Sequence, residues 1–259
     1  MNKHYNVIVI GGGPAGMMAA GRAAELGAHV LLLEKNERLG KKLALTGGGR
    51  CNITNAEFDN HLFLDNFKEH KQFLLSPFSQ FNSENTFKFF KEIGLPLIVE
   101  SQLRAFPKSE SAEDVCAVLC DYLKRHYVEI KTNTTVEGFL IKEEKVVGVE
   151  TSAGDFRAPK IILATGGLAA PETGSTGDGF AWLKKLGHTI TKPDTSLAPL
   201  KTSAKWVRGL SVVSVDEMEL RFLQDKKTKH KVRGRLLFTH FGISGPLVIN
   251  SAHKVKKLL

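Results

Sequence analysis

A glycine-rich turn close to the amino terminus constrains the fold of this chain more than any other feature. Gly11, Gly13 and Gly16 follow a short apolar run and open a stretch of small residues with helical spacing, and Glu34 ends a second apolar run. Strand, helix and strand in this order form a βαβ unit. In such a unit the first glycine permits the sharp bend, the second lets a phosphate approach the backbone, and the third lets the helix lie close to the sheet. The spacing therefore predicts a dinucleotide-binding site.

The residues around these glycines fit the same chemistry. Pro14 suits the first position of the helix, where a backbone amide hydrogen would have no partner. Free amides at the helix start, together with the helix dipole, can hold two phosphate charges without a lysine. Glu34 would accept hydrogen bonds from ribose hydroxyls and would repel a 2′-phosphate. The motif alone does not distinguish FAD from NAD.

Apolar and turn patterns predict that the rest of the first 190 residues continue an α/β fold. Ser111 begins a predicted helix, because its hydroxyl can accept from a free amide and Asp114 suits the positive end of the helix dipole. The apolar run at 161–164 is typical of a central parallel strand covered on both faces. The predicted helices cover residues 85–93, 111–125 and 177–186. Short strands that resemble a β-meander cover residues 128–131, 135–141, 146–151 and 155–158.

The pattern changes after Pro193, where predicted strands at 210–222 and 235–238 surround a basic turn. We therefore expect a domain boundary near residue 190, with a β-rich segment over residues 191–259. The chain ends in mid-pattern, without a closing strand or helix for the first domain. This predicts that the domain over 1–190 is incomplete and that the second is partial.

Five separated segments go beyond the generic turn. They are Gly-Gly-Gly-Pro-Ala-Gly at 11–16 with Glu34 and Lys35, Leu-Thr-Gly-Gly-Gly-Arg-Cys-Asn-Ile-Thr-Asn at 45–55, Ile-Leu-Ala-Thr-Gly-Gly at 162–167, Gly-Ser-Thr-Gly-Asp-Gly at 174–179 and Phe-Thr-His-Phe-Gly-Ile-Ser-Gly-Pro at 238–246. Together they resemble the BaiN/YhiN-like family of NAD(P)/FAD-dependent oxidoreductases, some of which are labelled aminoacetone oxidase-like. The resemblance covers essentially the whole chain. It implies a glutathione-reductase-like FAD/NAD(P)-binding Rossmann-type fold, with a separate domain inserted before the fold closes.

The same resemblance implies where the cofactor would lie. The amides of residues 12–16 would meet the pyrophosphate, Glu34 the adenosine ribose, and the backbone near Val136 the adenine. The loop at 46–52 and residues 164–167 would line the flavin side. Family members return to the FAD domain with a Gly-rich segment that contacts the flavin, and that segment is absent here. The candidate cofactor-binding residues are Gly11, Gly12, Gly13, Pro14, Ala15, Gly16, Glu34, Lys35, Thr46, Gly47, Gly48, Gly49, Arg50, Cys51, Asn52, Val136, Ala164, Thr165, Gly166 and Gly167.

The loop at 46–52 has its own physical logic. Three glycines allow close backbone approach, and Arg50 can offset negative charge on a phosphate or a reduced flavin. The alternative is a tight surface turn with a solvated arginine. Cys51 invites a redox role, but no Cys-x-x-Cys partner exists, which favours a buried and inert thiol.

No catalytic residue follows from the sequence alone. His240 could donate a proton to a substrate, because imidazole titrates near neutral pH, but a structural histidine at a strand end is the favoured interpretation. No metal-ligand spacing and no Gly-x-Ser-x-Gly motif occur, so a metal site and a hydrolase are not expected.

Composition limits the partners and the compartment. The chain of 259 residues has a formal net charge of +9, and much of the excess crowds residues 226–235, which favours a solvated hairpin over a polyanion site. Three cysteines are too few for a disulfide scaffold. No apolar run is long enough to cross a membrane and no export signal is visible, so we expect a cytoplasmic protein with a small-molecule substrate.

These observations support one main hypothesis and two alternatives. The main hypothesis is a flavoenzyme in which NAD(P)H docks transiently and electrons pass through FAD to a small organic acceptor or oxygen, because no second strand-linked G-x-G-x-x-G appears. The basic segment prompts the first alternative, a flavin-containing RNA-modification factor. The missing closing segment prompts the second, a non-catalytic FAD-binding fragment.

Overall fold

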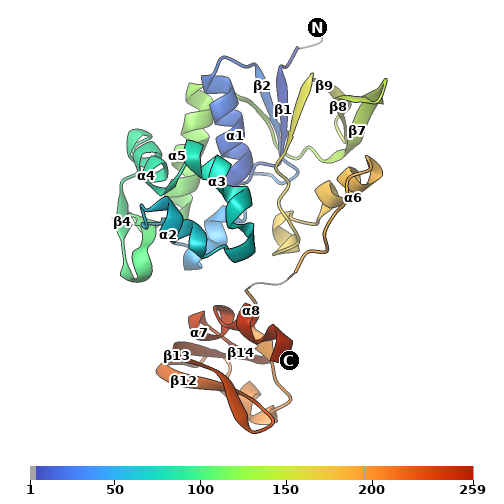
Figure 1. Ribbon diagram of the computed structural model, residues 1–259. Helices are drawn as coiled ribbons and strands as arrows, with labels where there is room; N and C mark the ends of the chain where they lie inside the picture. Colours follow the sequence, from blue (N-terminus) through green and yellow to red (C-terminus); the bar gives the residue numbers. More distant parts are fainter. Residues whose placement is uncertain (1–3, 195–196, 259) are drawn as a thin grey trace. The chain divides into compact units, whose positions relative to one another are not determined.

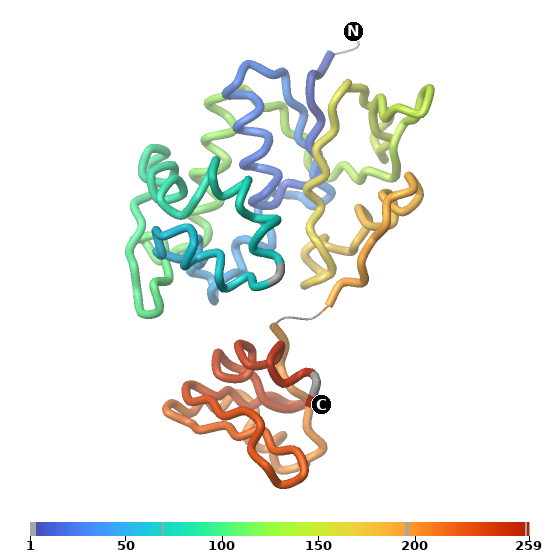
Figure 2. Tube along the Cα trace, in the orientation of Figure 1, coloured from blue at the N-terminus to red at the C-terminus, as the bar shows by residue number. Residues whose placement is uncertain are grey.

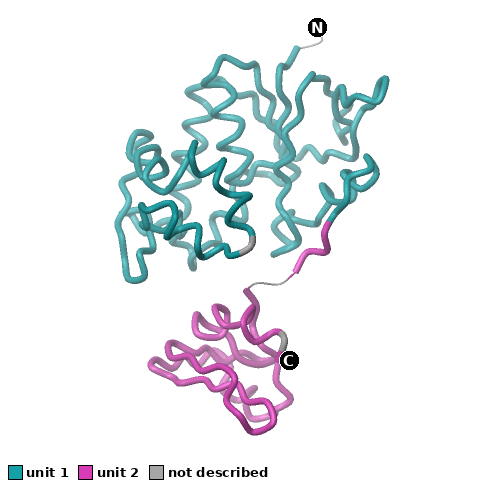
Figure 3. The backbone as a smooth tube through the Cα atoms, in the orientation of Figure 1, with its two compact units in different colours: residues 1–190 teal, residues 191–259 magenta. Residues whose placement is uncertain are grey.

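The computed structural model describes residues 4–194 and 197–258 (Figures 1 and 2). The chain divides into two compact units, residues 1–190 and 191–259, which Figure 3 shows in teal and magenta. Each unit has its own apolar core, and the two are described separately.

Four parallel strands form the central sheet of the first unit, in the order β10-β1-β2-β6. Alternate residues of β1 and β2 point to opposite faces, so the two short apolar runs supply two cores. Val9, Val30 and Leu32 pack toward the helices, and Leu31 and Leu33 pack toward the β-meander. The strands are β1 (Val7–Ile10), β2 (Val30–Leu33), β6 (Glu129–Lys131) and β10 (Lys160–Leu163).

Helices α1 (Pro14–Glu25) and α5 (Ala112–Arg125) cover one face of this sheet, as Figure 1 shows. They approach closely because α1 is built from small residues: a Cβ atom added at Gly21 would lie 2.1 Å from the ring of Tyr122. The predicted start of α5 is confirmed, since the Ser111 hydroxyl accepts from the amide of Asp114 at 3.2 Å.

The other face carries a β-meander and helix α6 (Asp178–Lys185). The expectation that residues 128–131 begin this meander is wrong, because β6 pairs in parallel with β2 in the central sheet. The meander is antiparallel, and its strands are β7 (Val136–Lys142), β8 (Lys145–Thr151) and β9 (Phe156–Arg157). The expectation of a central strand at 161–164 is wrong, because β10 is the edge strand of the sheet among the described residues and its apolar residues are half-buried. A continuous apolar run suits this edge as well, since Ile161 and Leu163 pack toward the meander and Ile162 toward α1.

The segment between β2 and α5 holds a small antiparallel sheet and three helices. The predicted helix at 85–93 is α4 (Ser83–Glu92), which begins at a reciprocal capping box between Asn82 and Asn85. The other elements are β3 (Thr54–Asn55), α2 (Asn60–Asp65), α3 (Lys71–Gln80), β4 (Leu97–Val99) and β5 (Arg104–Pro107). Short 3₁₀ turns of the described chain are η1 (Leu43–Gly48), η2 (Lys68–His70), η3 (Ser101–Leu103), η4 (Pro171–Thr173), η5 (Lys205–Leu210) and η6 (Lys256–Leu258).

The second unit is β-rich, with an antiparallel sheet in the order β11-β14-β13-β12. The basic segment lies along β13 itself, so the expectation that this strand begins at 235 is wrong. Alternation explains the difference: Val232 packs toward the core while Lys231 and Arg233 point to solvent. The elements are β11 (Leu200–Lys201), β12 (Ser214–Gln224), β13 (Lys227–Thr239), β14 (Gly242–Ser244), α7 (Pro246–Ile249) and α8 (Ala252–Val255).

Candidate functional site

A cavity of about 500 Å³ opens at the carboxyl ends of β1, β2 and β10. The backbone that follows each strand lines it, together with the turn at 40–42 and the loop at 173–175. Of the predicted cofactor-binding residues, those that line this cavity are Gly11, Gly12, Gly13, Pro14, Ala15, Glu34, Lys35, Val136, Ala164, Thr165 and Gly166. Residues far apart in the sequence therefore meet where a doubly wound sheet binds its ligands.

The three motif glycines are needed for different reasons. Gly11 has a φ of +104°, and a Cβ atom there would lie 2.5 Å from the carbonyl oxygen of Ala164. A Cβ atom at Gly16 would lie 1.8 Å from the carbonyl oxygen of Gly11, so α1 can rest on the turn only without a side chain. A Cβ atom at Gly13 would have nothing within 4 Å. Gly13 is thus free of any packing constraint and leaves the backbone open to a ligand.

The amino terminus of α1 has no protein cap. Gly13 occupies the N-cap position without a side chain, and no acidic residue lies in the first turn. The first bond of the helix runs from the amide of Met17 to the carbonyl oxygen of Gly13, at 2.9 Å. The amides of Ala15 and Gly16 therefore precede the helical ladder, where free N–H groups and the helix dipole favour an anion.

Glu34, at the end of β2, stabilises the glycine turn through a hydrogen bond. Its carboxylate is buried and accepts from the amide of Gly12 at 2.6 Å, so the Gly12 amide is engaged by the protein. The backbone and side-chain amides of Asn36 donate to the other oxygen, at 2.8 and 2.6 Å. A carboxylate has about four acceptor positions, so one remains for a hydroxyl of a sugar.

Two lysines at the cavity wall have different partners. Lys35 donates to Asp178 and to Thr176, at 2.7 Å each, and the bond from Lys35 is the main cause that lowers the pKa of the Asp178 carboxyl. Lys42 donates to the carbonyl oxygen of Ala169 and to the Ser175 hydroxyl, at 2.5 and 2.6 Å. Both partners of Lys42 are neutral, and no carboxylate pairs with it among the described residues, so its charge is available to an anion.

Sequence reasoning missed several of these residues. The cavity is also lined by residues that were not candidates, among them Asn36, Lys42, Ser175 and Asp178. The segment at 174–179 was recognised as a motif in the sequence, but no cofactor contact was predicted for it. Nothing in the sequence indicated that Lys42 would reach it, because the two residues of the Lys42–Ser175 bond are 133 positions apart.

A second cavity, of about 430 Å³, lies beside the first. Pro14 and Ala15 line both, and Thr46, Cys51 and Asn52 of the loop line the second only. The remaining lining is mostly apolar and comes from α1, η1, α4 and α5, with Ile53 and Phe81 beside them. The loop expected on the flavin side therefore reaches this cavity through three of its residues.

Cys51 is buried in the wall of this second cavity, with 2% of its surface exposed. Burial raises the pKa of the thiol, and a hydrogen bond with Thr46 offsets part of the increase. The neutral thiol is therefore favoured over the reactive thiolate. This agrees with the expectation of an inert, buried cysteine.

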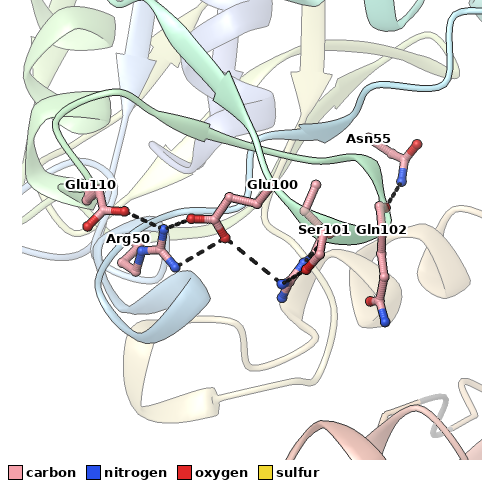
Figure 4. Close-up of polar contacts among 7 residues, drawn as sticks. Arg50, Asn55, Glu100, Ser101, Gln102 and Glu110 are labelled. Carbon is pink, nitrogen blue, oxygen red and sulfur yellow. Dashed lines mark hydrogen bonds and ion pairs between the residues drawn. The ribbon is translucent and has the colours of Figure 1, made fainter. Parts of the chain in front are cut away.

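Arg50 lines neither cavity. Its guanidinium pairs with Glu100 and, at 2.7 Å, with Glu110 (Figure 4). The guanidinium also lies over the ring of Phe106, with 4.3 Å to the centroid. The hydrogen bond from Arg50 lowers the pKa of the Glu100 carboxyl. Two carboxylates thus neutralise the charge that was expected to face a phosphate or a flavin, and the geometry assigns Arg50 to holding the loop in place.

Other predicted residues also lie outside both cavities. Gly47, Gly48 and Gly49 are exposed and all have positive φ, which suits a tight turn. Gly16 and Gly167 line neither cavity. His240 is exposed in the turn after β13, beside Phe241. Within residues 4–194 and 197–258, no group of three or more His, Cys, Asp or Glu side chains could hold a metal, and no helix is long and apolar enough to cross a membrane.

Comparison with known proteins gives the site a family context. The family model described as HI0933-like protein Rossmann domain matches residues 5–244. The 3-dehydro-bile acid delta(4,6)-reductase of Clostridium scindens is 32% identical over 253 residues, which cover 96% of this chain and 60% of that protein. The ribosomal RNA dihydrouridine synthases of Haemophilus influenzae and Escherichia coli are 28% and 26% identical, over 96% and 95% of this chain and 61% and 60% of their own lengths. The chain thus spans about 60% of these relatives.

Solved structures with this fold include a flavocytochrome and a ketosteroid dehydrogenase. The open conformation of a flavocytochrome c3 fumarate reductase has a TM-score of 0.61 at 20% identity, over 88% of this chain and 49% of that one. The 3-ketosteroid-delta4-(5alpha)-dehydrogenase of Rhodococcus jostii RHA1 has a TM-score of 0.55 at 17% identity, over 73% of this chain and 55% of that one. At these identities the likeness shows the fold, which is the predicted Rossmann-type α/β fold.

Proposed function

The chain belongs to the HI0933-like Rossmann family of FAD-dependent oxidoreductases, and from that premise we propose that it is the FAD-binding part of an enzyme that reduces a carbon–carbon double bond conjugated to a carbonyl group. The observation that carries the proposal is the uncapped start of α1. Gly13 is open there, the amides of Ala15 and Gly16 are free of the helical ladder, and buried Glu34 stands beside them.

The residues present fit the adenosine and diphosphate half of FAD. Free amides at the start of α1 would hold the diphosphate, and the charge of Lys42 would add to their attraction. Glu34 would use its remaining acceptor position for a ribose hydroxyl. The apolar cavity beside Cys51 would exclude water from the ring system. When bound, the flavin would accept a hydride from a reduced nicotinamide and deliver it to the acceptor.

The choice of acceptor comes from the relatives. The names of three sequence relatives, a delta(4,6)-reductase, a dihydrouridine synthase and an NADH:fumarate oxidoreductase, describe acceptors with one chemistry. In each, a carbonyl group withdraws electrons from a neighbouring carbon–carbon double bond. The net reaction would add a hydride and a proton across that bond and oxidise NAD(P)H to NAD(P)⁺. A small unsaturated ketone is the first candidate, because the reductase of that class is the relative with 32% identity.

A uracil base in RNA is the second candidate acceptor. Two relatives are ribosomal RNA dihydrouridine synthases. One feature of this chain favours it as well, since a strand of the second unit is lined with cations. A non-catalytic FAD-binding fragment is the remaining alternative, and measurable turnover by the chain would exclude it.

The test of the proposal is a stopped-flow experiment on protein reconstituted with FAD. Mixing with NADH or NADPH is expected to bleach the visible band of the oxidised flavin, and an unsaturated ketone is then expected to restore it without oxygen. Protein that takes up no FAD would contradict the cofactor assignment. A flavin that neither nicotinamide reduces would contradict the donor. A reduced flavin that only oxygen reoxidises, when both the unsaturated ketone and a uridine-containing RNA are offered, would contradict the acceptor class.

A further inference from the structure

The net positive charge of this chain comes entirely from its second unit. Residues 191–259 hold 14 of the 36 lysines and arginines but only 5 of the 27 aspartates and glutamates, so the whole formal excess of +9 lies there. Residues 1–190 carry equal numbers of both signs. A surface that served only an anionic cofactor in the first unit would not need this separation. The imbalance instead indicates an anionic partner for the second unit.

The cations gather on the hairpin formed by β12 and β13, visible in the lower part of Figure 1. Lys231, Arg233 and Arg235 occupy alternate positions of β13 and are exposed, while the residues between them face the core or the sheet interior. Arg221 lies directly opposite Lys231 on β12. The hairpin tip adds three exposed lysines. We define the basic hairpin as Arg221, Lys226, Lys227, Lys229, Lys231, Arg233 and Arg235.

Carboxylates neutralise only part of this hairpin. Glu219 lies opposite Arg233 in the strand register but pairs with Arg221 at 2.6 Å and with Lys231 at 2.7 Å. Asp216 pairs with Arg235. Among the described residues, Lys226, Lys227, Lys229 and Arg233 have no carboxylate partner. The exposed carboxylates of Glu217 and Asp225 on the same hairpin form no ion pair among the described residues and offset part of this charge. The hairpin keeps a net positive charge, and a bound polyanion would relieve the repulsion between its cations.

We propose that the basic hairpin is a docking surface for the phosphate backbone of RNA. The inference rests on the proposed function for the identity of the polymer, and it deepens the second candidate acceptor. Alternate residues of a strand are about 6.6 Å apart, so successive cations can each meet a different phosphate of an extended strand. A line of charges of this kind matches a linear polymer better than it matches a membrane surface. The aromatic rings of this hairpin, Phe222 and His230, are half-buried and contact each other across the two strands. Contacts of the exposed cations would therefore be to phosphates and would not depend on base sequence.

The experiment measures fluorescence anisotropy of a labelled single-stranded oligouridylate titrated with the full chain. The test variant carries Lys227→Gln, Lys229→Gln and Arg233→Gln. Three lost phosphate contacts are expected to lower the slope of log K against log salt by about 2, which weakens binding about 100-fold at about 0.1 M salt. The charge-conserving variant Lys227→Arg, Lys229→Arg and Arg233→Lys is expected to retain binding.

A matched control removes the same total charge from the first unit. The control variant carries Lys142→Gln, Lys145→Gln and Lys184→Gln, at exposed positions outside both cavities. Its Kd for the oligouridylate is expected to lie within about twofold of that of the unmodified chain. Equal losses in the two variants would overturn the proposal in favour of a net-charge effect. Absence of binding to the oligouridylate, or binding of phosphatidylserine vesicles in its place, would also overturn it.

Flavin content is measured on the same preparations, which separates this inference from the proposed function. FAD uptake without RNA binding refutes the docking surface alone. RNA binding without FAD uptake refutes the proposed cofactor and leaves the basic hairpin intact.

Discussion

Replacement of Gly13 by alanine separates ligand binding from folding. The backbone at Gly13 has φ −75° and ψ −179°, which any residue can adopt, and a Cβ atom would meet nothing within 4 Å. The change is therefore expected to leave stability unchanged or to raise it by about 0.4–1 kcal/mol, because alanine restricts the unfolded chain. A methyl group there would stand between the diphosphate and the amides at the start of α1.

The loss of affinity follows from the contacts that the methyl group would prevent. A hydrogen bond from an amide to a charged phosphate contributes about 1.5–3 kcal/mol. Loss of one such bond is expected to raise the Kd for FAD about 10- to 100-fold. The contrasting variant is Gly16→Ala, whose Cβ atom would lie 1.8 Å from the carbonyl oxygen of Gly11. That variant is expected to lose about 1–3 kcal/mol of stability before any ligand is added.

The assay pairs FAD titration, followed by quenching of flavin fluorescence, with urea unfolding of the apoprotein. The expected result is a weak-binding, stable Gly13→Ala variant and a destabilised Gly16→Ala variant. If Gly13→Ala binds FAD as tightly as the unmodified chain, no phosphate lies against this turn and the reasoning is refuted.

Three further predictions follow from the site and its surroundings. Glu34→Gln is expected to raise the Kd for FAD about tenfold or more. The Kd for FMN is expected to stay unchanged, since FMN lacks the adenosine that Glu34 would contact. Equal effects on the two Kd values in parallel titrations would count against the ribose contact. Arg50→Met is expected to speed hydrogen exchange of the backbone amides at 46–52. Arg50→Lys is expected not to restore their protection, because lysine cannot both pair with two carboxylates and stack on a ring. Unchanged exchange rates would show that the ion pairs do not hold the loop. Burial raises the pKa of the Cys116 thiol from 9.0 to about 11, so the folded state keeps that proton to higher pH than the unfolded state. The stability linked to this proton, about 3 kcal/mol, is complete below pH 9 and lost as the pH rises to 11. Cys116→Ala is expected to flatten this decline in the free energy of unfolding measured in urea, and an identical decline would refute the assignment.

The parts of the fold that were predictable are those that local rules determine. A short apolar run, a glycine turn and a serine cap predict β1, α1 and the start of α5, because each signal acts within a few residues. The Cβ positions at Gly11 and Gly16 give the same reasons for glycine that the motif implied. These constraints come from the backbone, and a sequence displays them directly.

The missed parts depend on partners that are distant in the sequence. The two carboxylates that pair with Arg50 lie 50 and 60 positions away, and the carboxylate that pairs with Lys35 lies 143 positions away. The sequence shows that a side chain is charged but does not show which distant carboxylate pairs with it. Strand β13 begins earlier than expected because pairing with β12 overrides the low strand preference of its lysines. Tertiary contacts therefore decide which cations are free.

The central claim is that the uncapped start of α1 holds the diphosphate of FAD. A crystal structure of the chain grown with FAD tests this most directly. We expect density for the diphosphate within hydrogen-bond distance of the Ala15 amide, with a ribose hydroxyl on Glu34. A structure in which FAD binds elsewhere, or in which the protein's own side chains fill this cavity while FAD is present in excess, would contradict the account.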